Sequence, residues 1–349
     1  MIPGRVVRFP SHDVRGAAVE QTGLLHVPAT PPPPGGWPYV VYGHMTTGGG
    51  DRAAPSACTP DHPERRRMTQ GDEVCRGLLA HGVAVLRPDY EGIGSPGPHP
   101  YLVGSSLARS VLDMAAARRA LDPRIGDAWV AVGHSEGAVA VLHAAARSRQ
   151  DERTGHDLRG VAALTPVTRT DRTIGLASRL RVRVPGTSVV TALTGLMLRG
   201  ATTVDPALEA LLLDGGLSPD AAARWSHLDE RCLVELADAA SWGGLAPAAV
   251  WGPRAATARA ALLAHLHAED VLHVALPRLP VRVDLGLLDE VAPAPLTAAL
   301  VRRWRAAGVP VVARAWPTHH SGVLQRRHAP PAVVAWVRRV LDLDPAGPG

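Results

Sequence analysis

A serine between two glycines is the first feature of this sequence that could carry out chemistry. The residues GHSEG, 133–137, interrupt an otherwise apolar stretch at 128–146. A strand that turns at once into a helix leaves little room, and glycines two positions before and after the serine remove side chains that would collide. The serine is then held in a strained backbone conformation, with its hydroxyl above the end of the sheet. The pattern predicts a nucleophile elbow with Ser135 at its tip.

A serine hydroxyl is a poor nucleophile at neutral pH, so it needs a base to take its proton and an acid to orient that base. After an elbow of this kind, the acid comes next along the chain and the histidine follows it. Asp289 comes after a strand-like segment at 279–286 and is our candidate acid. Asp284 is the rival, but it lies inside that segment, and Glu290 would point elsewhere.

Two adjacent histidines, His319 and His320, follow the next strand-like segment, at 308–316. This is where the base of a serine triad is required. The residues by themselves leave both histidines open as the base.

Acyl transfer also needs hydrogen-bond donors aimed at the oxyanion that develops on the attacked carbonyl. The first expected donor is the backbone N–H of Glu136, directly after the nucleophile. The second should come from the glycine-rich loop HMTTGGGD at 44–51, where we select Thr46, with Met45 behind it. The alternative is that this loop is a flexible surface turn without a function.

Short β-type segments alternate with helical ones along most of the chain. This alternation predicts an α/β fold with a mostly parallel central sheet flanked by helices. The expected strands are 22–28, 37–43, 82–90, 128–133, 160–164, 279–286 and 308–316.

The pattern changes between the fifth and sixth of these strands, where strand signals fade and helical ones dominate. Asp205-Pro206 and Ser218-Pro219 each place a capping residue before a proline, which is typical of a helix start. We therefore expect a catalytic core formed by residues 1–165 and 276–349, with a helical cap inserted at 166–275.

Composition limits the partners. The net charge is +5, every basic residue is arginine, and the arginines are scattered without a nucleic-acid-binding motif. Three cysteines without CxxC spacing argue against a zinc site or a full disulfide framework, although one bridge stays possible. The stretch TSVVTALTGLML is too short to span a bilayer. Charges near the N-terminus, where a signal peptide needs an apolar core, slightly favour the cytoplasm unless a leader precedes this sequence.

Several motifs together resemble the secretory lipase family of α/β-hydrolases. They are YGHMTTGGGDRAAPS, PDYEGIGSPGPHPYLVG, GHSEGA, GLLDEVAP and THHSGVL, and the resemblance runs over residues 7–341. It implies lipase or esterase activity, a helical cap over the active site, and a triad of Ser135, Asp289 and a histidine. His320 precedes the Ser-Gly pair, as the base usually does in that family, while His319 stays open.

Three departures from the family pattern stand out. Met45 replaces the second residue of the usual HGTTG motif and adds bulk beside the expected oxyanion site. Ala53 stands where the family has a cysteine, so a disulfide common among secreted members is expected to be missing. Ala138 replaces the glycine that usually follows the elbow.

The cap sequence contains a cluster of apolar side chains that could face lipid or a long acyl chain. Ordinary burial inside the cap is the favoured alternative. The cluster consists of Leu193, Leu196, Met197 and Leu198.

We therefore expect a serine hydrolase that cleaves a small-molecule carboxylic ester through an acyl-enzyme and requires no metal or organic cofactor. An acyltransferase or cyclase with the same triad is the first alternative, because pocket shape and dryness choose the resolving nucleophile. A binding protein that keeps a hydrolase scaffold without turnover is the second.

Overall fold

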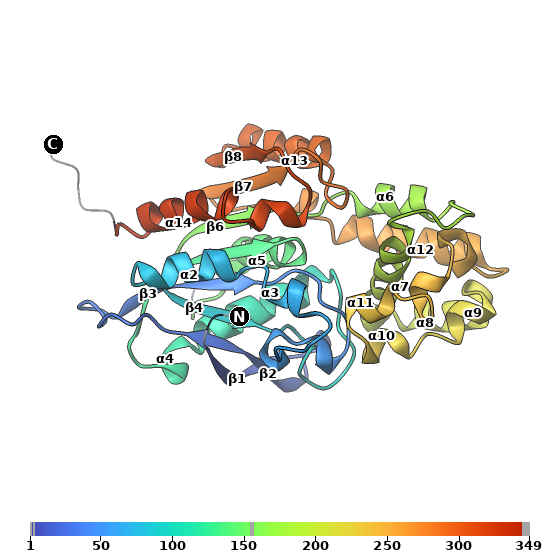
Figure 1. The fold of residues 1–349 in the computed structure, drawn as a ribbon, viewed down its shortest axis with the longest axis horizontal. Helices are drawn as coiled ribbons and strands as arrows, with labels where there is room; N and C mark the ends of the chain where they lie inside the picture. The colour runs from blue at the N-terminus through green and yellow to red at the C-terminus, as the bar shows by residue number, and fades with distance from the viewer. Residues whose placement is uncertain (1, 3, 154–156, 344–349) are drawn as a thin grey trace.

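The computed structural model describes residues 2, 4–153 and 157–343. Within this part of the chain, eight strands form one sheet in the order β1-β2-β4-β3-β5-β6-β7-β8 (Figure 1). β1 and β2 run antiparallel to their neighbours, and all other pairs are parallel. The strands are β1 (Arg5–His12), β2 (Ala18–His26), β3 (Trp37–Gly43), β4 (Ala84–Pro88), β5 (Ile125–His134), β6 (Leu158–Leu164), β7 (Val281–Gly286) and β8 (Val311–Trp316).

Seven of these strands correspond to the expected ones, and β1 was missed. Its side chains alternate, with Val7 and Phe9 buried and their neighbours exposed. Pro10 lies within it, which an edge strand tolerates because one side has no partner. The alternation was visible in the sequence, but the charges and the proline disguised it.

Helices cover both faces of the sheet (Figure 1). On β3, Tyr39 and Val41 belong to the core cluster on the face of α3 and α5, whereas Val40 and Tyr42 belong to the cluster on the face of α2 and α14. A strand buried on both sides is apolar throughout, which explains the unbroken apolar runs. The helices of this core are α1 (Arg65–Met68), α2 (Asp72–Ala80), α3 (Gly104–Ala116), α4 (Arg118–Leu121), α5 (Glu136–Arg147), α13 (Ala294–Ala306) and α14 (Ala329–Val340).

The segment between β6 and β7 is helical, as expected, and lies at one end of the molecule (Figure 1). Asp205 and Ser218 accept hydrogen bonds from Leu208 N and Ala221 N, which confirms both predicted helix starts. The fold is therefore an α/β core around a mostly parallel sheet, with a helical cap before the last strands. Domain limits at 166 and 275 stay predictions. The cap helices are α6 (Thr170–Ala177), α7 (Thr187–Val204), α8 (Pro206–Leu211), α9 (Pro219–Ala222), α10 (His227–Glu230), α11 (Leu233–Leu236) and α12 (Ala255–Ala268).

Short helical turns of other types complete the fold. They are η1 (Asp51–Ala53), η2 (Pro55–Ala57), η3 (Ser148–Gln150), η5 (Leu212–Gly216), η6 (Trp242–Gly244), η7 (Pro247–Val250), η8 (Val271–His273) and η9 (Ser321–Leu324).

The apolar cluster on α7 is part of the interior of the cap. Leu196, Met197 and Leu198 are at most 4% exposed, and Leu193 is half-buried against the same core. The favoured expectation of ordinary burial therefore holds, and these side chains do not face a lipid surface. None of the described helices is both long enough and apolar enough to cross a bilayer.

Candidate active site

Ser135 occupies a sharp turn between β5 and α5. Its backbone has φ 58° and ψ −118°, a conformation that residues with side chains rarely adopt. Its N–H donates to Leu164 O at the end of β6, 2.9 Å away, which ties the turn to the neighbouring strand. A strained residue held by its surroundings at a strand end has the backbone geometry predicted for the elbow.

The two glycines around the serine are needed because a side chain at either position would collide with nearby backbone. A Cβ on Gly133 would lie 2.0 Å from Gly137 O, and a Cβ on Gly137 would lie 2.1 Å from Gly43 O. Both contacts are with backbone, so no side-chain rotation could relieve them. The turn accepts only glycine at these positions.

The structure brings Asp289 and His320 together from loops that follow β7 and β8. His320 Nδ1 lies 2.9 Å from Asp289 Oδ1 and 2.8 Å from Oδ2, and both side chains are buried. Asp289 Oδ1 also accepts from the backbone N–H of Val291, at 2.9 Å, and of Ala292, at 2.6 Å. A carboxylate oxygen fixed by three donors can orient the imidazole that it contacts.

His320 also lies beside the elbow. The rings of His134 and His320 are 5.0 Å apart between centroids, and His134 is the residue before Ser135. Burial, with a smaller contribution from the neighbouring His320 imidazole, holds the pKa of His134 well below its usual range, so His134 stays neutral. His134 is thus a packing neighbour of the candidate base that does not compete for protons.

The second ring nitrogen of His320 is available for chemistry. Nε2 is buried and has no hydrogen-bond partner among the described residues, and the structure records no bond from it to Ser135. Ser135 itself is only 5% exposed. Catalytic hydrogen bonds are often long before substrate binds, and they tighten in the complex.

The rival side chains have other partners. Asp284 is wholly buried and accepts from both Arg282 and Trp316 Nε1. Glu290 accepts from the backbone N–H of His320 at 3.2 Å, so it supports the loop and does not contact the imidazole. His319, the neighbouring histidine, is exposed.

The glycine-rich loop is buried except at Asp51, so it is not a flexible surface turn. Every residue from 44 to 50 is buried, and Thr47 O accepts from Leu233 N of the cap at 2.7 Å. Thr46 Oγ1 lies 3.0 Å from the hydroxyl of Tyr101. Met45 is buried at 7% exposure, so the family departure at this position adds apolar volume inside the protein. The loop is held by both core and cap.

Glu136 begins α5, and its backbone N–H therefore lies outside the helix's own hydrogen bonds. Its side chain has a role that the sequence analysis missed. Glu136 Oε1 lies 2.7 Å from His99 Nε2, both side chains are almost wholly buried, and Oε2 finds no partner among the described residues.

His99 donates from its other nitrogen to Glu91 O at 2.7 Å. Burial by itself lowers the pKa of His99, but the contacts with the Glu136 carboxylate and with Glu91 together outweigh it and raise the pKa overall. The hydrogen-bonded pair therefore links the residue after Ser135 to the 91–101 loop. The HPY and DYEG motifs marked the stretch that contains His99, but nothing in the sequence indicated which acidic side chain His99 would contact.

In the part of the chain that the structure describes, no group of three or more metal-ligating side chains is found, and Cys58, Cys75 and Cys232 are free thiols. Burial raises the pKa of Cys75 and Cys232 to about 12, so neither is an activated nucleophile.

The sheet, the elbow at a strand end and the inserted cap define an α/β-hydrolase fold. The model of the secretory lipase family matches residues 67–349. The chain belongs to the secretory lipase family. Family and fold together support a carboxylic ester hydrolase of the lipase and esterase type.

Solved structures agree on the fold. Candida antarctica lipase A is similar with a TM-score of 0.73 and 17% identity, over 90% of this chain and 72% of that one. The rice cell wall degrading esterase LipA from Xanthomonas oryzae gives 0.72 and 17%, over 97% and 90%. A putative hydrolase from Legionella pneumophila gives 0.71 and 17%, over 99% and 89%. A search of curated proteins finds no match to this sequence.

Proposed function

We propose that the protein hydrolyses carboxylic esters through an acyl-enzyme on Ser135, with His320 as base and Asp289 as the orienting acid. One observation carries the proposal. The His320 imidazole is fixed by Asp289 through Nδ1 while Nε2 stays buried and unpartnered, beside a strained elbow. That arrangement suits a base that receives one proton and returns it.

The first half of the reaction forms the acyl-enzyme. Ser135 Oγ attacks the ester carbonyl carbon while its proton passes to His320 Nε2, and the carbonyl oxygen becomes an oxyanion. The N–H groups of Glu136 and Thr46 donate to that oxyanion. When the carbon–oxygen bond to the alcohol breaks, His320 gives its proton to the leaving oxygen.

The second half returns the enzyme to its starting state. A water molecule loses a proton to His320 Nε2 and attacks the acyl carbon, and the new intermediate expels Ser135 Oγ, which recovers that proton. The carboxylic acid departs. Asp289 orients the imidazole throughout and stabilises the imidazolium that forms twice per cycle.

Labelling with a fluorophosphonate tests the nucleophile directly. The wild-type protein should incorporate one label at Ser135, and Ser135→Ala should incorporate none. The wild-type protein should also hydrolyse chromogenic esters, and a series of increasing acyl length defines the acyl preference. Equal labelling of the two proteins would refute Ser135 as the nucleophile. Product analysis with alcohol acceptors separates hydrolysis from acyl transfer.

We also propose transient contact of the cap with a lipid surface as a route to ester substrates. The buried α7 cluster does not supply that contact. Exposed residues elsewhere in the cap would have to supply it.

A further inference from the structure

The segment that joins α6 to α7 carries arginines and apolar side chains in alternation. Residues 179–184 are RLRVRV, and every residue from 179 to 186 is exposed. Leu180, Val182 and Val184 are 43%, 62% and 49% exposed, and Leu176 in α6 is 72% exposed. Single exposed apolar side chains are ordinary, but four between residues 176 and 184 are a concentration that calls for a partner.

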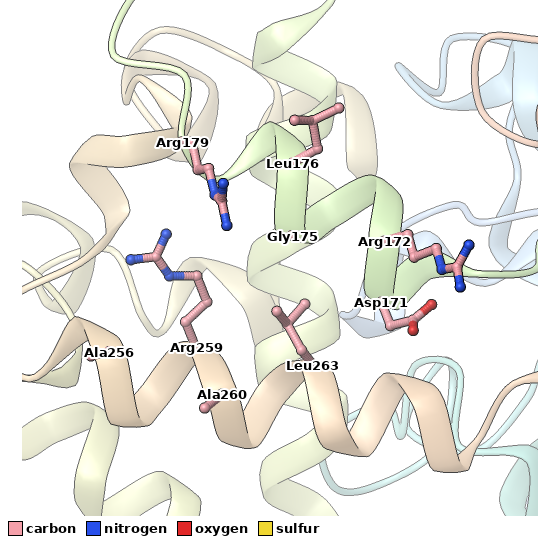
Figure 2. Close-up of a pocket in the computed structure, with 9 residues that line it drawn as sticks. All are labelled: Asp171, Arg172, Gly175, Leu176, Arg179, Ala256, Arg259, Ala260 and Leu263. Atoms are coloured by element: carbon pink, nitrogen blue, oxygen red, sulfur yellow. The ribbon is translucent and has the colours of Figure 1, made fainter.

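An open pocket of about 800 Å³ lies between α6 and α12, next to this segment. Figure 2 shows Arg179 and Arg259 extending toward the same space between the two helices, with Asp171 and Arg172 farther along α6. The Arg259 guanidinium lies 5.7 Å from the ring centroid of Trp251, which helps to hold its direction. Two guanidinium groups that face one space favour an anion between them.

The positive charge of this region is uncompensated. The sequence has no acidic residue from Arg172 to Val204. Asp171, the carboxylate in the pocket wall, is already engaged by Arg169 at 3.0 Å and His267 at 3.3 Å. Among the described residues, no ion pair is made by the five arginines of this region, which are Arg172, Arg179, Arg181, Arg183 and Arg259.

The combination of charge and apolar surface selects one kind of partner. A nucleic acid would satisfy the arginines and leave the apolar side chains in water, and residues 170–204 contain no aromatic side chain on which bases could stack. A bilayer with anionic headgroups satisfies both, because phosphates pair with arginine while leucine and valine enter the interfacial region.

We propose that this basic apolar surface, formed by the five arginines and the apolar side chains at 176–184, docks the cap onto a bilayer that contains anionic phospholipids. The pocket between α6 and α12 receives a headgroup phosphate between Arg179 and Arg259. Docking needs no step of the ester chemistry, so it stands or fails independently of the triad.

Sedimentation with vesicles tests the proposal. The full-length protein should bind vesicles of phosphatidylcholine with phosphatidylglycerol and should not bind phosphatidylcholine alone. Salt should weaken the binding, because the arginine contribution is screened. Ser135→Ala should bind as the wild-type protein does, which separates docking from catalysis.

Removing the charges of the exposed arginines gives the most direct test of the surface. The triple variant Arg179→Gln, Arg181→Gln, Arg183→Gln should bind anionic vesicles about a hundredfold more weakly, since each basic residue near an anionic leaflet contributes about fivefold. The matched control Arg302→Gln, Arg303→Gln, Arg327→Gln removes the same charge from exposed positions on the core and should bind within about twofold of wild type. Equal losses of vesicle binding in the two triple variants would overturn the proposal that this surface docks on the bilayer.

Replacing exposed apolar side chains tests whether they insert into the interfacial region of the bilayer. Leu180→Ser with Val182→Ser should weaken vesicle binding by about tenfold while leaving the net charge unchanged. No loss in this variant would overturn interfacial docking. Binding to heparin as strong as to anionic vesicles would overturn the lipid assignment, and so would self-association that the arginine variant abolishes without any vesicle binding.

Discussion

The candidate catalytic site at the sheet edge and the basic apolar surface of the cap differ in how their polar groups are partnered. At the sheet edge, Asp289 has three donors and His320 is almost fully buried. On the cap, the arginines at 179, 181 and 183 are exposed and form no ion pair with any described residue. Catalysis needs groups that are already oriented before substrate arrives, whereas docking needs charges that are still free to meet a partner.

The comparison also separates what each region contributes to stability. Buried charged groups are destabilising unless each is paired, so loss of one partner at the sheet edge has a large cost. Exposed charges are already solvated, so their loss changes stability little. The predictions below test this contrast from the largest effect to the smallest.

Removal of the nucleophile should have the largest effect. Ser135→Ala should lower kcat on a soluble chromogenic ester by at least about 10⁴-fold, because no other hydroxyl occupies the elbow tip. The melting temperature should stay within a few degrees of wild type. Turnover near the wild-type rate in a folded variant would remove Ser135 from the mechanism.

Loss of His320 should lower kcat nearly as much, whereas loss of His319 should hardly change it. His320→Ala should lower kcat by about 10⁴-fold, since the imidazole held by Asp289 is lost. His319→Ala should change kcat by less than about threefold, because His319 is exposed. Steady-state kinetics on the same ester measures both, and a reversed order would transfer the role of base to His319.

Removing the charge of Glu136 from its buried pair with His99 should have an intermediate effect on stability, and the effect should depend on pH. Glu136→Gln removes the charge that raises the pKa of His99. The stabilisation from a raised histidine pKa is complete below the ordinary histidine value and is lost as pH rises through the folded-state value. The free energy of unfolding should therefore fall by about 3–5 kcal/mol at about pH 6 and by less at about pH 9.

A surface ion pair supplies the control for that prediction. Glu209 pairs with Arg199 at 3.3 Å and is 37% exposed at its side chain. Glu209→Gln should cost about 1 kcal/mol or less at either pH, measured by denaturant unfolding. An equal loss at both pH values in Glu136→Gln would contradict a charged His99.

The exposed arginines should matter least to the folded protein. The triple variant at 179, 181 and 183 should change the free energy of unfolding by less than about 0.5 kcal/mol. Its turnover of a soluble short-chain ester should match that of wild type, because the substitutions lie outside the catalytic groups. A large loss of stability would show that these side chains are structural, and the contrast between the two regions would fail.

Local patterns in the sequence were enough for the α/β fold, the elbow and the cap. The glycine at 133 reflects a backbone contact with Gly137, within five residues along the chain, and strand patterns reflect burial on both faces of a sheet. β1 was missed because a proline and charged side chains at its exposed positions disguise its alternation. Each of these features leaves a local pattern of residue types, which is why one sequence could indicate them.

Only the tertiary structure decided which side chains meet across the chain. From the sequence alone, His319 and His320 are equally suitable as the base. The packing of the loops after β7 and β8 buries His320 against Asp289 and leaves His319 exposed. The meeting of Glu136 with His99 and the exposure of residues 179–186 likewise depend on contacts between distant segments. A sequence indicates where a turn, a strand or a cap is favourable, but burial and partner choice depend on how those elements pack together.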